Sequence, residues 1–186
     1  MSIDYPENRF WEYSLKIYGG EGVSRAFINI QDRHEMDVNL LLLSIWVGGT
    51  GRGTLSLPQF SQLIEVSQLW NREIVCKLRA VRDRLKDPFQ GFSEPHTEEM
   101  RKSVLGLEIE CERIEHLALS SVLGDIALGP DQPDSGSLKQ VITNISNYFT
   151  AKNCVVNEPD LGDFFVILAA AFPLATRHEI REEFLG

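Results

Sequence analysis

The stretch Ile28–Trp46 reads INIQDRHEMDVNLLLLSIW and decides the fold. From Val38 onward it is apolar on every side of a helix, apart from Asn39 and Ser44. A helix without a polar face is stable only when other elements surround it. The sequence therefore predicts a central apolar helix that is capped by Asp37 and enclosed by amphipathic helices.

Capping residues and glycine stops mark helices on both sides of this segment. Asn8 precedes an amphipathic stretch that ends at Gly19-Gly20, and Ser56 with Gln59 forms a capping box before the longest predicted helix. No segment shows period-two alternation, so the predicted fold class is all-α, a helical bundle. The predicted helices cover residues 9–18, 22–31, 38–47, 57–87, a long stretch after Thr97, 138–149, 161–172 after Asp160, and a short terminal stretch after Thr176.

The two long helices are expected to form an antiparallel hairpin. Residues 57–87 hold six basic and four acidic side chains, a net charge of +2, whereas residues 88–134 hold three and ten, a net charge of -7. A short connection between helices of opposite charge favours side-by-side packing. The apolar seam predicted on the second helix alternates steps of four and three. It consists of Met100, Val104, Leu107, Cys111, Ile114, Ala118 and Ser121.

Turn-forming residues divide the chain near its last third. Residues 129–136 read GPDQPDSG, which lacks apolar residues and is typical of a linker. We expect a bundle core over 1–128 and a C-terminal helical extension over 137–186 that packs on that core. Ser137 with Gln140, and Thr176 with Glu179, are predicted to cap helices in the extension.

Charge and composition exclude several classes of partner. The formal net charge of -9 argues against nucleic acid and anionic membranes, because both need a basic face. The longest apolar runs are about half the roughly 20 residues of a membrane span. Three cysteines are too few for a disulfide framework, and no export signal opens the chain. We therefore expect a cytoplasmic protein with no membrane span and no cofactor.

The chain resembles a bacterial family of conserved hypothetical proteins, a domain of unknown function, over about residues 8–122. The motifs that carry the resemblance are Phe10-Trp11-x-x-Ser14-Leu15-x-x-Tyr18, Gly22-Val23, Gln31-Asp32, Asp37-Val38-Asn39-Leu40, Trp70-x-x-Glu73-Ile74-Val75-x-x-Leu78-Arg79-x-x-Arg82 and Glu108-Ile109-Glu110-Cys111-Glu112. The resemblance implies a small bacterial helical protein without an established activity, and it does not extend to residues from about 129 onward.

The polar corner before the central helix is the first candidate site. It contains Gln31, Asp32, Asp37 and Asn39. One interpretation is a small pocket for a ligand or metal at the mouth of the buried helix. The other is structural, with Asp32 closing one helix, Asp37 starting the next, and the two amides satisfying backbone groups at a tight corner.

A second candidate lies on the long helix after Thr97. Glu108, Glu112 and Glu115 share one stripe, with His116 beside them, and inward carboxylates bind metal in di-iron bundles. Those bundles need Glu-x-x-His motifs, which this chain lacks. Placed at the flank of the predicted seam, the carboxylates are better explained as edge charges. Their predicted partners are Arg72, Arg79 or Arg82.

Aromatic residues of the C-terminal extension form the third candidate, an interaction surface. They are Tyr148, Phe149, Phe164, Phe165 and Phe172. This much apolar surface must be buried, either on the chain's own bundle or against another chain. Since no nucleophile set is visible, the leading hypothesis is a non-catalytic protein that binds a protein partner or forms a homo-oligomer. The alternative hypothesis is a helical pocket protein or enzyme that uses the Asp32/Asp37 corner.

Overall fold

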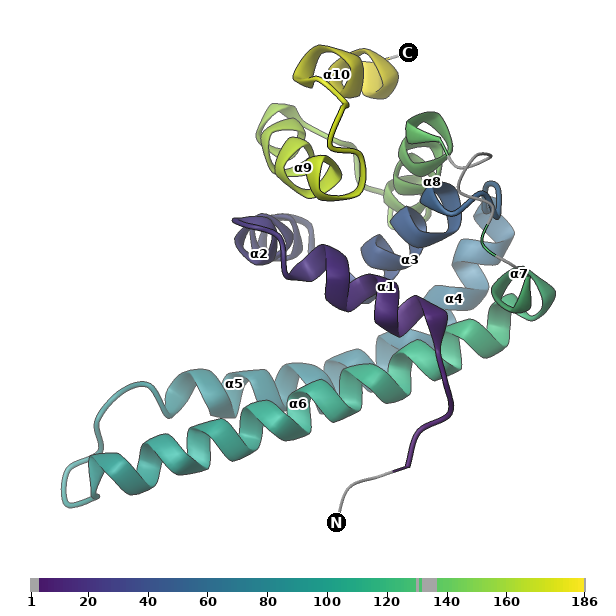
Figure 1. Ribbon diagram of the computed structural model, residues 1–186. Coiled ribbons are helices and arrows are strands. Elements are labelled where there is room, and N and C mark those ends of the chain that lie inside the picture. Colours follow the sequence, from purple (N-terminus) through teal and green to yellow (C-terminus); the bar gives the residue numbers. More distant parts are fainter. Residues whose placement is uncertain (1–3, 130, 132–136, 186) are drawn as a thin grey trace.

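The computed structural model describes residues 4–129, 131 and 137–185, and every regular element within them is helical (Figure 1). The all-α prediction is confirmed. No helix in these ranges is long and apolar enough to cross a membrane. The elements are α1 (Arg9–Tyr18), α2 (Val23–His34), α3 (Val38–Gly49), α4 (Leu57–Trp70), the π-helix η1 (Asn71–Val75), α5 (Cys76–Arg84), α6 (Glu94–Leu123), α7 (Asp125–Leu128), α8 (Leu138–Ala151), α9 (Glu158–Ala171) and α10 (Arg177–Leu185).

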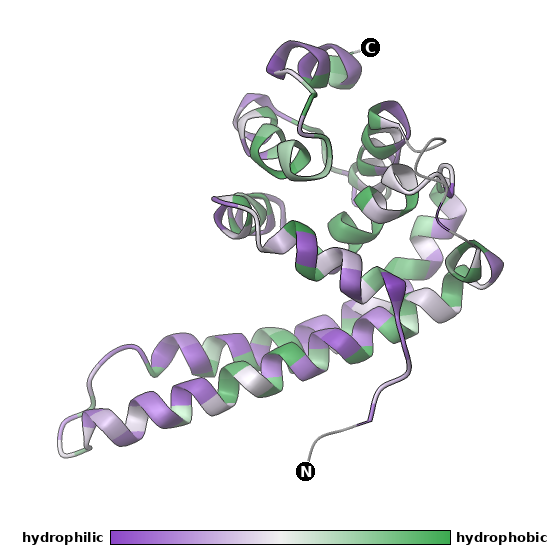
Figure 2. Ribbon diagram, viewed as in Figure 1, coloured by the Kyte–Doolittle hydropathy of each residue, from purple (hydrophilic) through white to green (hydrophobic). Residues whose placement is uncertain are grey.

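Helix α3 is the buried centre of the fold, as predicted. Asp37 caps it, because its carboxylate accepts a hydrogen bond of 2.9 Å from the Asn39 N–H. Leu41 is fully buried and Trp46 is 1% exposed. Figure 2 shows α3 as one of the most continuously hydrophobic helices, with α1 and α8 beside it. The helix therefore supplies the surface on which the others pack.

Helix α8 packs closely against α3. The two backbones meet at Gly48, where a Cβ atom would lie 2.5 Å from the backbone nitrogen of Val141. The Ser137 N–H donates to the Gly48 carbonyl at 3.2 Å, and Ser137 caps α8 by accepting from Gln140 N–H. The C-terminal segment is thus part of the same buried cluster as α3. The predicted linker 129–136 lies mostly outside the described residues.

Polar contacts hold α9 against α2. Asp160 is fully buried and accepts hydrogen bonds from Arg33 and His34, the latter at 2.8 Å. Asn29 donates to Asp163 at 2.9 Å. The sequence placed the start of α9 after Asp160, which is wrong. Asn157 is the cap, and Asp160 completes its capping box from the third helical position.

Helices α4, η1 and α5 run antiparallel to α6 and form the predicted hairpin, whose far end projects from the body as an arm (Figure 1). Helix α6 forms one side of the hairpin by itself. It starts at Glu94, four residues before the predicted start, because Ser93 is its cap and Pro95 fits its first turn. The predicted seam is also wrong. Met100 and Leu107 are each 56% exposed. The buried side chains of α6 are Val104, Glu108, Glu115, His116, Leu119 and Leu123.

Candidate functional site

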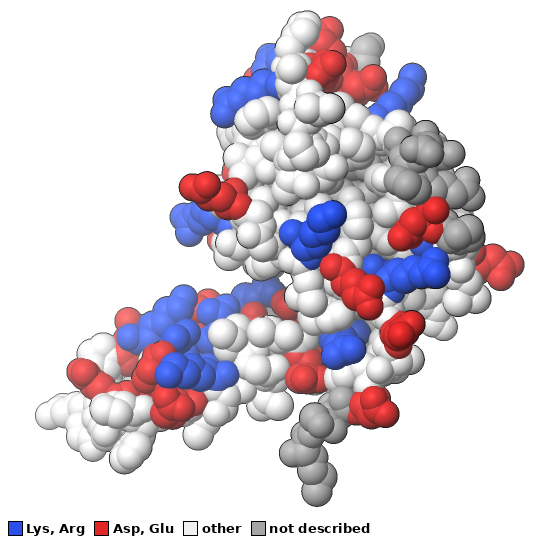
Figure 3. All heavy atoms as spheres, in the orientation of Figure 1, with Lys and Arg blue, Asp and Glu red and all other residues white. Residues whose placement is uncertain are grey.

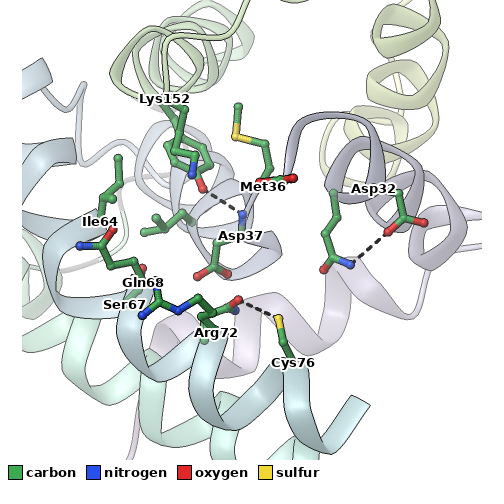
Figure 4. A pocket seen from close by; sticks show the side chains of 14 residues that line it. Asp32, Met36, Asp37, Ile64, Ser67, Gln68, Arg72, Cys76 and Lys152 are labelled. Carbon is green, nitrogen blue, oxygen red and sulfur yellow. Dashed lines mark hydrogen bonds between the residues drawn. The ribbon is translucent and has the colours of Figure 1, made fainter. Parts of the chain in front are cut away.

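A pocket of about 650 Å³ opens at the corner between α2 and α3, opposite α4 and η1 (Figure 4). Of the predicted corner residues, Gln31, Asp32 and Asp37 line it, whereas Asn39 lies outside the lining. The apolar wall is formed by Met36, Leu40 and Ile64. The polar lining also includes Glu35, Ser67, Gln68, Asn71, Arg72, Cys76, Tyr148 and Lys152.

The chain conformation at the corner fixes the position of Asp37. Glu35 adopts a left-handed conformation with φ of 51°, which ends α2 and reverses the chain. Asp37 then takes the extended conformation of a helix cap. Its backbone N–H donates to the Tyr148 hydroxyl at 3.0 Å, a contact drawn in Figure 4. The structural interpretation of the corner therefore holds for Asp37, and the same residue also lines the pocket.

Glu115 lies behind Asp37 and is 2% exposed. The Asn39 side-chain amide donates to its Oε2 at 2.9 Å. Burial and the charge of Asp37 raise the pKa of Glu115 well above its ordinary value. Glu115 is thus a neutral acid at neutral pH, beside the Asp37 carboxyl. Asp37 lines the pocket, and Glu115 lies behind it, outside the lining.

Ser67 lines the pocket from α4 with a hydroxyl that has no partner. The side chain is 1% exposed, and its Oγ makes no hydrogen bond to another residue in the described part of the chain. Most buried hydroxyls in folded proteins are hydrogen-bonded, because an unpaired polar group costs about 1–3 kcal/mol. Ser67 therefore marks a position where the pocket offers a hydrogen bond to something other than the protein.

The π-helix η1 continues the pocket wall from α4. Asn71 and Arg72 belong to it, and Cys76 follows directly. The Cys76 thiol donates to the Asn71 side-chain oxygen at 3.3 Å. Burial raises the pKa of Cys76, so the thiol stays protonated and is a poor nucleophile. A π turn inside an otherwise α-helical stretch is uncommon and is found frequently at functional sites.

An arginine network extends from the pocket into the hairpin. Arg79 donates to Gln31 at 2.5 Å, to Glu108 at 2.9 Å and to Glu112 at 3.1 Å. Arg82 donates to the other oxygen of Glu108 at 2.6 Å. The expected pairing with Arg79 and Arg82 is present, whereas Arg72 pairs with its neighbour Glu73. Burial raises the pKa of Glu112 to about 7.

The carboxylates of α6 and His116 do not converge on a metal site. The His116 ring donates to the Glu112 carbonyl through Nδ1 and accepts from the Ser14 hydroxyl through Nε2, at 2.9 and 3.1 Å. Burial lowers the pKa of His116 to about 4, so the ring is neutral. Within the described ranges, no group of three or more His, Cys, Asp or Glu side chains could hold a metal ion.

The aromatic residues predicted as an interaction surface do not form one. Tyr148, Phe149 and Phe164 are buried in the chain's own core. Phe165 and Phe172 are partly buried against the same core. The Phe149 and Phe164 rings pack edge to face with their centroids 5.8 Å apart. Of the two alternatives, these positions agree with burial on the chain's own bundle and not with a surface for another chain, because α8 and α9 use these rings to cover α3 and α2.

The sequence analysis missed the pocket residues that lie far from the corner in the chain. Ser67, Tyr148 and Lys152 reach it from α4 and α8, and no motif links them to Asp37. Glu115 was considered only as a metal ligand or an edge charge. The one available signal was Ser67, a serine on the apolar side of a predicted helix. Its position alone does not indicate a site, because the side chains around it are not known from the sequence.

Fold and site together define an all-helical protein with one polar pocket beside a buried central helix. The chain belongs to the family described as protein of unknown function (DUF2390), whose sequence model matches residues 9–119. That segment includes Asp37, Ser67, η1 and Glu115, but it ends before Tyr148 and Lys152. Comparisons with curated proteins and with solved structures gave no match.

Proposed function

We propose that this protein binds a small organic molecule in the pocket formed by α2, α3, α4, η1 and α8. One observation supports this most directly. The Ser67 hydroxyl is buried, lines the pocket and lacks a hydrogen-bond partner in the described part of the chain. A bound molecule would provide that partner and offset its desolvation.

Three further features support binding at this position. The cavity volume lies within the range of about 300–1,000 Å³ that is typical of small-molecule sites. The pKa of Glu115, which lies behind Asp37, is strongly raised, and strongly perturbed pKa values are more common at functional sites than elsewhere. The π turn η1 widens the helix where Asn71 and Arg72 line the pocket.

Native mass spectrometry of protein purified without chelator tests the proposal, together with a thermal-shift screen of a metabolite library. Gln68→Trp places a large side chain at the exposed rim of the pocket and should abolish the retained mass or the stabilising hits. Gln62→Trp, on the exposed side of the same helix and outside the pocket lining, is the matched control. If neither method finds a molecule whose binding depends on position 68, the proposal is wrong.

A second candidate function is association with another protein chain, through the arm rather than the C-terminal aromatic residues. Apolar side chains on the arm are exposed. They include Val81 at 50%, Phe92 at 70%, and Met100 and Leu107 at 56%. Figure 3 shows that charged side chains of both signs also gather on the visible face of the arm. Exposed apolar side chains with polar groups around them are found at sites of association between chains.

Light scattering after size exclusion tests self-association. A dimer that Leu107→Lys converts to a monomer, while Leu128→Lys on the body does not, would support the second candidate. We also propose a cytoplasmic location and no role for nucleic acid. The support is that Cys76, Cys111 and Cys154 are free thiols and that the net charge is -9.

A further inference from the structure

Building on the proposed function, we infer that the pocket takes an organic ammonium ion, an amine with an apolar body, whose charged group sits on Asp37 and Ser67. The inference concerns the chemical class of the ligand. It rests on the charges that line the pocket, on the hydrogen-bonding capacity left at its floor, and on the apolar wall opposite.

The charges in the pocket favour a cation. Asp32, Glu35 and Asp37 face Arg72 and Lys152 in the lining. The side chain of Arg72 is 70% exposed and pairs with Glu73 at 2.8 Å, so its charge is offset outside the pocket. Asp37 makes no ion pair with any basic side chain among the described residues. A partly buried carboxylate without a cation is costly, and a ligand cation relieves that cost.

The Asp37 carboxylate and the Ser67 hydroxyl in the pocket have unused hydrogen-bond acceptor positions. A carboxylate offers about four lone-pair positions. Asp37 uses one for the Asn39 N–H, and its Oδ2 has no hydrogen-bond partner in the described part of the chain. The Ser67 hydroxyl has no partner. An ammonium group carries three donors and matches these acceptors, whereas a carboxylate or phosphate ligand would place its oxygens against Asp37.

The remaining lining selects an organic cation over a metal ion. No group of three metal-binding side chains gathers in the described part of the chain. Arg72 and Lys152 line the same pocket, and Figure 4 shows the Lys152 side chain extending into it. The charge of Lys152 opposes a divalent ion more than a singly charged one. Met36, Leu40 and Ile64 provide an apolar wall that a hydrated metal would not use.

Three probes that differ in one group test the inference, namely phenethylamine, phenethyl alcohol and hydrocinnamate. Titrations followed by amide chemical shifts in the full chain should show the amine binding at least about tenfold more tightly than the alcohol, and hydrocinnamate binding most weakly. A charge-assisted hydrogen bond of about 1.5–3 kcal/mol corresponds to roughly 10–100-fold in affinity.

Asp37→Asn isolates the charge, because asparagine caps a helix as well as aspartate does. This variant should lose at least about tenfold in affinity for phenethylamine, a loss that exceeds any change in its affinity for phenethyl alcohol. Glu65→Gln, an exposed acid on α4 outside the pocket lining, is the control and should change neither. Unchanged amine binding in Asp37→Asn would overturn the inference.

The outcomes separate this inference from the proposed function. If the alcohol or hydrocinnamate binds as tightly as the amine, in a manner that Gln68→Trp blocks, the pocket binds ligands but not by their positive charge. The inference then fails and the proposed function stands. If none of the three probes binds while the library screen yields a Gln68-dependent ligand, the inference again fails alone. If no ligand of any kind is found, both fail.

Discussion

Asp37 combines two roles that are usually separate. Its Oδ1 caps α3, and its charge faces the pocket and the Glu115 acid. The cap stabilises the helix by about 1 kcal/mol, and Asp37 also lines the pocket opposite α4. Because burial and the neighbouring Asp37 raise the pKa of Glu115, the two carboxyls do not both carry a charge at neutral pH.

Substituting Glu115 by glutamine should test whether this side chain is neutral in the folded protein. In the folded protein the pKa of Glu115 is raised, so the group stabilises the fold fully below its unfolded pKa of about 4.5, and that contribution is lost as the pH rises toward the folded pKa. Glu115→Gln removes this loss. The free energy of unfolding of Glu115→Gln relative to the original chain should therefore rise between pH 4.5 and pH 8 in urea titrations.

Asn39→Ala is the control, because it removes the neighbouring amide without removing the titrating group. It should lower stability across that pH range without abolishing the slope. A difference between Glu115→Gln and the original chain that stays flat from pH 4.5 to pH 8 would show that Glu115 is ionised in the fold.

Replacing Ser67 by alanine should leave the free energy of unfolding unchanged or raise it by up to about 1 kcal/mol in the absence of ligand, because the hydroxyl has no partner to lose. Ser14→Ala is the matched comparison. Ser14 is also buried, but its hydroxyl bonds to His116 at 3.1 Å, and its loss should cost about 1–3 kcal/mol. Equal losses for both variants in chemical denaturation would contradict the assignment of Ser67.

At the scale of the element, the π turn η1 is the feature that shapes the pocket wall. It inserts one residue into the path from α4 to α5 while both flanks keep their faces toward α6. Deleting the exposed Glu73 should convert the stretch to a continuous α-helix. We expect circular dichroism and the stability of the hairpin to change little, while ligand affinity falls at least about tenfold because Asn71 and Arg72 move.

Glu73→Ala is the control, since it removes the same side chain and keeps the residue count. It should bind ligand more tightly than the deletion variant, because it loses only the ion pair of Arg72. If the deletion variant binds with undiminished affinity, the π turn does not shape the site.

The helix caps could be predicted from the sequence. The burial of polar side chains by partners on other helices could not. Asn8, Asp37 and Ser137 act as caps through side-chain bonds to backbone N–H groups two or three residues away, which any local pattern reveals. The seam of α6 was wrong because Glu108 and Glu115 occupy its buried positions. Their burial depends on hydrogen bonds from Arg79 and Arg82 of α5 and from Asn39 of α3. A pattern of apolar residues along one helix does not reveal such partners.

The candidate site was predictable only in part, for the same reason. Gln31, Asp32 and Asp37 lie close enough in the chain to be recognised as a polar corner, and they line the pocket. Ser67 and Tyr148 complete it from elements that follow the corner by tens of residues. A site assembled from distant helices has no spacing to detect in one sequence.

At the scale of the whole molecule, the contacts of α9 decide how firmly the C-terminal helices are held. Asp160→Ala should cost about 3–5 kcal/mol, because it leaves Arg33 and His34 without their buried partner and removes half of a capping box. Asp163→Ala, at a more exposed pair with Arg33, should cost about 1 kcal/mol or less. Thermal and urea unfolding measure both, and similar losses would contradict the distinction.

Cutting the chain after residue 128 tests whether residues 1–128 are a domain. Helix α8 covers α3, so removal of residues 129–186 should expose fully buried side chains such as Leu41 and Ile45. We expect the truncated chain to aggregate or to lose cooperative unfolding. A soluble truncated chain with a sharp thermal transition would instead establish residues 1–128 as an independent unit.

The residue at position 48 shows whether a C-terminal helix can pack against α3 as α8 does here. A side chain there would push into the backbone of Val141, so only glycine allows α8 to lie where it does. Gly48 lies inside the segment shared with the family, whereas α8 lies beyond it. In a family member with alanine or a larger residue at this position, the C-terminal helix must therefore pack at a different place. Otherwise, another element must bury that side of the central helix.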